Sequence, residues 1–69
     1  MADMDLLISA VAFDMRDSGD FSDINVARCV QVIARSASVL APVANKVQNG
    51  SDRAFARFVK AVRASMARA

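Results

Sequence analysis

Histidine, glutamate, tryptophan and tyrosine are all missing from this 69-residue sequence, and cysteine and proline each occur once. Without histidine, neither a histidine-activated nucleophile nor a histidine-containing metal site can form. No group of aspartates has the spacing of a calcium loop, which also needs a glutamate at its end. The sequence therefore predicts no enzyme, no catalytic residue, no metal site and no cofactor.

The single cysteine, Cys29, excludes a disulfide within the chain, and small chains that fold without disulfides are typical of the cytoplasm. Cys29 lies in an apolar helical pattern, which predicts a buried structural thiol. The longest uncharged stretch, residues 36–45, has ten residues, whereas a membrane span needs about 20. The acidic N-terminal region is unlike a secretory signal. We expect a cytoplasmic protein with no membrane segment.

Charge is divided unevenly along the chain. Residues 1–23 contain six aspartates and one arginine, a net charge of −5. Residues 24–69 contain eight basic residues and one aspartate, a net charge of +7. Because the chain is short, folding brings two regions of opposite sign close together, which favours a charged surface for a partner.

Helical spacing of the apolar residues predicts a single all-α domain over residues 1–69. Three helices are expected, over residues 3–16, 22–41 and 52–68. Their ends carry ordinary signals, because Gly19 suits a left-handed C-terminal cap and serines precede the second and third helices.

Pro42 interrupts the long central helix. It lacks a backbone N–H and clashes with the carbonyl four residues earlier, at a cost of about 3 kcal/mol in a helix interior. Two outcomes remain open: Pro42 kinks the helix, or a new short helix begins with Pro42 in its first turn.

The central segment also carries an unbroken heptad pattern. Its apolar residues recur at alternating spacings of four and three, as in a coiled-coil seam. One interpretation is an ordinary core stripe of a helix bundle. The other, which we prefer, is a homodimer interface, because a 69-residue chain with 55% hydrophobic residues has few other elements to cover the stripe. The predicted interface residues are Val26, Val30, Ile33, Ala37, Leu40 and Ala44.

The last helix is amphipathic and basic, which predicts a partner-binding face formed by Arg53, Arg57, Lys60 and Arg63. A protein partner with an acidic surface is the preferred interpretation. A small basic DNA-binding regulator is an alternative, although the net charge of +2 is low and no Tyr or Trp offers base stacking. A helix lying on a membrane surface is a third, weaker interpretation, and a merely solvated basic surface is the simplest one.

The short, glutamate-free, arginine-rich helical outline of the chain resembles the small accessory proteins of bacteriophages. Within that group, its length and three-helix outline are similar to the phage quorum-sensing anti-activators. The resemblance implies a small helical homodimer that binds a LuxR-type transcription activator of the host. Anti-defence proteins that bind a CRISPR or other immune effector share the same outline. No functional residue is transferred from either group.

Overall fold

The computed structural model describes residues 2–68 of the chain, and the described part is all-helical. Four α-helices and one 3₁₀ turn follow one another without a strand among these residues. The all-α class predicted from the sequence is therefore confirmed. The elements are α1 (Ala2–Ser18), α2 (Asp23–Ser36), η1 (Ser38–Leu40), α3 (Ala41–Gln48) and α4 (Asp52–Ala67).

The expected helix ends form as the sequence indicates. Gly19 has a φ of 72° and its N–H donates to the carbonyl of Met15 at 2.9 Å, which closes α1 with a left-handed residue. Ser22 caps α2 by accepting from the N–H of Asn25 at 3.2 Å. Ser51 caps α4 in the same way, accepting from the N–H of Ala54 at 3.2 Å.

The predicted long central helix is broken, and this part of the three-helix prediction is wrong. α2 ends at Ser36, and Ala37 leaves the helical region with φ −129° and ψ 87°. A continuous helix would press the ring of Pro42 against the carbonyl of Ser38 and remove that carbonyl's donor. The chain instead makes one 3₁₀ turn and starts α3, with Pro42 in its first turn. The alternative of a separate short helix is therefore the correct one, and the break falls five residues earlier than expected.

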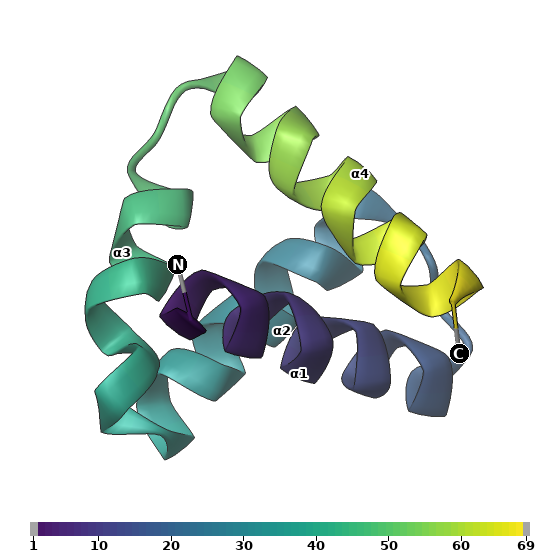
Figure 1. Ribbon diagram of the computed structural model, residues 1–69, viewed down its shortest axis with the longest axis horizontal. Coiled ribbons are helices and arrows are strands. Elements are labelled where there is room, and N and C mark those ends of the chain that lie inside the picture. The colour runs from purple at the N-terminus through teal and green to yellow at the C-terminus, as the bar shows by residue number, and fades with distance from the viewer. Residues whose placement is uncertain (1, 69) are drawn as a thin grey trace.

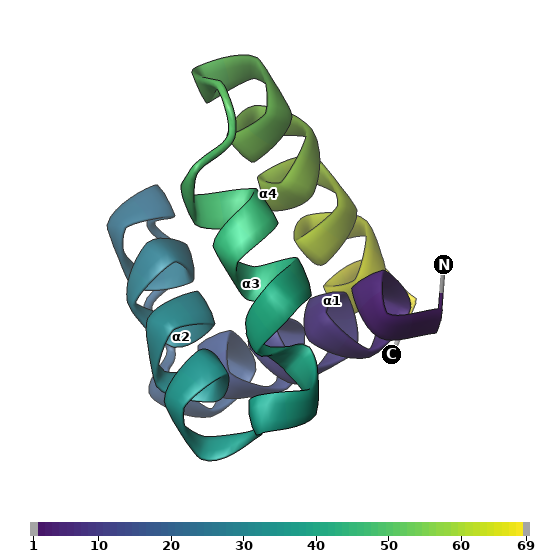
Figure 2. The ribbon, with the colours of Figure 1, turned by 90° about the vertical axis from the view of Figure 1, so that its left-hand side faces the viewer.

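α1 lies at the centre of the bundle and packs against α2, α3 and α4 (Figures 1 and 2). Its apolar residues cover most of its circumference, so several neighbours can bury it at once. Every helix contributes to one continuous core. The buried core consists of Leu7, Val11, Ala12, Met15, Val26, Cys29, Val30, Ile33, Leu40, Ala44, Val47, Phe58, Val59 and Val62.

The heptad stripe of the central segment belongs to this core. Five of its six residues are buried within the single chain, and Ala37 is half-buried. The break at Ala37 explains how so short a chain covers the stripe, because α3 can turn back and pack on α1 and α2. A single chain therefore buries these residues as an ordinary core stripe, and the expectation that it has too few elements to cover them is wrong. The residues are Val26, Val30, Ile33, Leu40 and Ala44.

Candidate functional site

The four basic residues predicted as a partner-binding face are all exposed on α4, but they are not equivalent. Arg63 is engaged within the chain: its Nη2 donates to Asp23 Oδ1 at 3.1 Å and to the carbonyl of Phe21 at 3.2 Å. That contact is the one ion pair found among residues 2–68. The other three, Arg53, Arg57 and Lys60, thus carry charge that no carboxylate of the described chain pairs with, and we call them the basic face.

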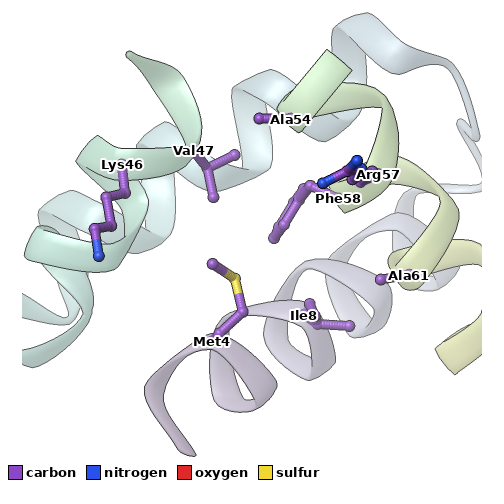
Figure 3. A pocket seen from close by; sticks show the side chains of 8 residues that line it. All are labelled: Met4, Ile8, Lys46, Val47, Ala54, Arg57, Phe58 and Ala61. Atoms are coloured by element: carbon purple, nitrogen blue, oxygen red, sulfur yellow. The ribbon is translucent and has the colours of Figure 1, made fainter. Parts of the chain in front are cut away.

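An apolar pocket opens beside the basic face, where α1, α3 and α4 diverge (Figure 3). Its volume is about 370 Å³. Apolar side chains from three helices line it, two cationic side chains stand at its edge, and no carboxylate takes part. We call it the α4 pocket. Its lining residues are Met4 and Ile8 of α1, Lys46 and Val47 of α3, and Ala54, Arg57, Phe58 and Ala61 of α4.

Small residues keep this pocket open. Ala54 and Ala61 stand seven residues apart, two turns along the same side of α4, and neither side chain reaches across to α1 or α3. Gly50 fixes the connection between α3 and α4, since a Cβ at this position would lie 3.0 Å from the carbonyl oxygen of Lys46. After this connection α4 runs away from the short helix α3 (Figure 1). Residues of α3 and α4 form the walls of the pocket, and Met4 and Ile8 of α1 form its floor (Figure 3).

The acidic part of the chain lies against the basic part, as the sequence predicts, because α1 packs on α4. The link between them at the far end of α4 is a hydrogen bond: Arg16 Nη2 donates to the carbonyl of Met66 at 3.3 Å. A cation at this place also suits the negative end of the α4 dipole. The aspartates of α1 stay outside this contact, but two of them lie beside other basic residues: Asp3 lines a hollow with Lys46, and Asp5 lines one with Arg68.

A second exposed surface lies on the opposite side of α1. Leu6 and Phe13 are two turns apart on the same side of α1 and are 58% and 67% exposed. Asp17, one turn beyond Phe13, lines a hollow together with Arg28 and the half-exposed Val32 of α2. We call these five residues the outer face.

The one cysteine is not placed for chemistry. Cys29 is 5% exposed in the core, and its burial, followed by the negative charge of Asp14, raises the pKa of the thiol. The thiol therefore stays protonated at neutral pH and is a poor nucleophile.

Hydrogen bonds from Ser22, whose backbone N–H donates to Asp20 Oδ1 at 3.1 Å, lower the pKa of Asp20 and keep that exposed carboxyl ionised.

Residues 2–68 hold no group of three or more histidine, cysteine, aspartate or glutamate residues arranged to bind a metal ion. Among the described helices, none is both long enough and apolar enough to cross a membrane.

Sequence reasoning found the basic residues but missed the pocket beside them. The apolar residues Met4, Ile8 and Phe58 were recognisable only as helix faces, because their convergence depends on the break at Ala37 and on the direction of α4. One signal was available: Ala54 and Ala61 interrupt the larger apolar residues of α4 at a spacing of seven.

Comparisons with protein-family models, with curated proteins and with solved structures found no match to this chain.

Proposed function

We propose that this chain is a small non-enzymatic inhibitor that binds another protein through the basic face and sequesters it. The observation that carries the proposal is the position of three uncompensated cations, Arg53, Arg57 and Lys60, beside an open apolar pocket. Arginine next to apolar and aromatic side chains is typical of protein interfaces. The partner is expected to present acidic residues, because unlike charges speed association and favour the correct orientation.

The resemblance to phage anti-activators supports a phage origin and action in the cytoplasm of a bacterial host. A LuxR-type transcription activator is accordingly the first partner to test, and a CRISPR or other immune effector is the second. The basic face would also suit contacts with phosphates, so a DNA-binding regulator is the alternative function. Protein and nucleic-acid binding differ in salt response, since binding through phosphate contacts loses affinity steeply between about 50 and 200 mM salt.

Reversing one charge of the basic face is expected to weaken partner capture about tenfold. The experiment is affinity capture from nuclease-treated bacterial lysate, followed by measurement of the affinity of the retained protein for wild type and for Arg53→Glu. Arg35→Glu is the matched control, because Arg35 is an exposed arginine of α2 and its reversal changes the net charge equally. Equal affinity of the two variants would show that the basic face is only a solvated surface.

Homodimer formation is also part of the proposal, but through the outer face instead of the buried heptad stripe. The acidic residue Asp17 of this face lies on α1 and the basic residue Arg28 lies on α2, and the two helices run in opposite directions (Figure 1). A two-fold axis parallel to the helices would set α1 of each copy against α2 of the other. Asp17 would then meet Arg28, and Phe13 would meet Val32, twice in each dimer.

Phe13→Asp is expected to weaken self-association about thirtyfold or more, the effect of losing an aromatic hot spot. Sedimentation equilibrium of the wild type should show a particle of twice 7.4 kDa at high protein concentration. Phe13 is mostly exposed, so the variant should keep its helicity and melting temperature. Ala56→Asp, which adds the same charge to an exposed position of α4, is the control. A wild-type mass of 7.4 kDa at every concentration would refute the dimer.

A further inference from the structure

The α4 pocket has a chemistry that selects its occupant. Its interior is apolar: Met4, Val47 and Phe58 point toward one another from three helices, and Ile8 of α1 also lines it (Figure 3). A side chain of similar character can replace water there, at a gain of about 25 cal/mol for each Å² of apolar surface removed from water. The pocket therefore fits a large aliphatic or aromatic group and disfavours a purely polar ligand.

The two cations at the edge of the pocket stand on different walls. Lys46 comes from α3 and Arg57 from α4, and the apolar interior lies between them (Figure 3). Neither forms an ion pair with a carboxylate in the described chain, although Asp3 lines a neighbouring hollow together with Lys46. A ligand with an apolar group between two negative charges would complement both the interior and the two cations. A fatty acid has one carboxylate, so it can pair with only one of the two cations.

We propose that the α4 pocket holds one large apolar side chain of an acidic amphipathic helix in the partner protein. On such a helix, residues three or four positions before and after the apolar anchor lie on the same side, so two carboxylates flank it. One of them meets Lys46 and the other meets Arg57. This inference rests on the proposed function, because it names the part of the partner that binds in the pocket beside the basic face.

The probe is a synthetic helical peptide of about 15 residues with a central leucine and aspartates on both sides of it. In an NMR titration of the full chain, its addition should shift the backbone resonances of Ile8, Val47 and Phe58. A peptide with lysines in place of the aspartates, and one with alanine in place of the central leucine, should each bind at least about tenfold more weakly. Equal binding of all three peptides would overturn the proposal.

A matched pair of variants tests the position of the site. Ala54→Phe fills the pocket from an exposed position of α4 and should weaken peptide binding at least about tenfold. Ala56→Phe places the same side chain two residues further on, outside the pocket, and should change binding less than about twofold. Both alanines are exposed, so both variants should fold. Equal effects of the two substitutions would contradict the pocket as the site.

The charged edge is tested with Lys46→Glu, which should weaken peptide binding about fivefold. Sodium decanoate is the second probe. If decanoate binds as tightly as the peptide and Lys46→Glu leaves peptide binding unchanged, the pocket is a lipid site and the proposal fails. If Arg53→Glu weakens partner capture while Ala54→Phe leaves it unchanged, the proposed function stands and the pocket inference alone is refuted.

Discussion

Replacing Ile33 with aspartate is expected to unfold the chain at every protein concentration. Ile33 is 7% exposed and lies in the core formed by all four helices. A carboxylate there would have no partner, and an unpaired buried charge costs about 4 kcal/mol or more. A domain of this size has a free energy of unfolding of about 3–10 kcal/mol, so the substitution removes most or all of it.

Circular dichroism at 222 nm measures the effect. Ile33→Val is the conservative control and should cost about 1 kcal/mol. Val32→Asp is the positional control, because Val32 is half-exposed on the same helix and its substitution should leave the chain folded. The experiment also separates the two interpretations of the heptad stripe. If Ile33 lay in a dimer interface, helicity of the aspartate variant would return as the protein concentration rises.

The prediction from sequence succeeded where local chemistry decides the structure. The caps at Gly19, Ser22 and Ser51 depend on φ and on hydrogen bonds within three or four residues, and all three form as expected. The apolar face of α4 was also recognisable, since Phe58, Val59 and Val62 are buried. Its cations are exposed for the same reason: they occupy the opposite side of one regular helix.

The prediction from sequence failed where the path of the chain through space decides the structure. A heptad pattern has the same phase in a core stripe as in a dimer seam, so spacing alone could not separate them. The break at Ala37 depends on Pro42 five residues later and on the burial of Leu40. The pocket depends on the direction of α4 after Gly50, which no local pattern encodes. The exposed aromatic Phe13 was also indistinguishable from a core residue in the sequence.

Asn25 is a further residue that the sequence did not single out, although it lies four residues before Cys29 on the core side of α2. It is 2% exposed, and its side chain connects α1 and α2. Its Nδ2 donates to Ser18 Oγ at 3.0 Å and to the carbonyl of Asp20 at 2.8 Å. Its Oδ1 accepts two hydrogen bonds from Arg28, one from Nε at 3.2 Å and one from Nη2 at 2.9 Å. The amide therefore uses both donors and its acceptor in the turn between the helices.

Asn25→Ala is expected to lower the free energy of unfolding by about 2 kcal/mol, since the partners at the turn lose their bonds. Asn25→Asp should cost more, about 3 kcal/mol, because a carboxylate cannot donate to the carbonyl of Asp20 and would place two oxygens in contact. Urea denaturation gives both values, and the melting temperature of the alanine variant should fall by about 10 °C.

Asn45→Ala is the control for these substitutions, because Asn45 is an exposed asparagine of α3 and no hydrogen bond of its side chain is found among the described residues. Its substitution should change the free energy of unfolding by less than about 0.5 kcal/mol. If Asn25→Ala is equally mild, the hydrogen bonds at the turn contribute nothing net to stability. The burial of α1 against α2 alone would then hold these helices together, and Asn25→Asp would remain the more damaging change only through its charge.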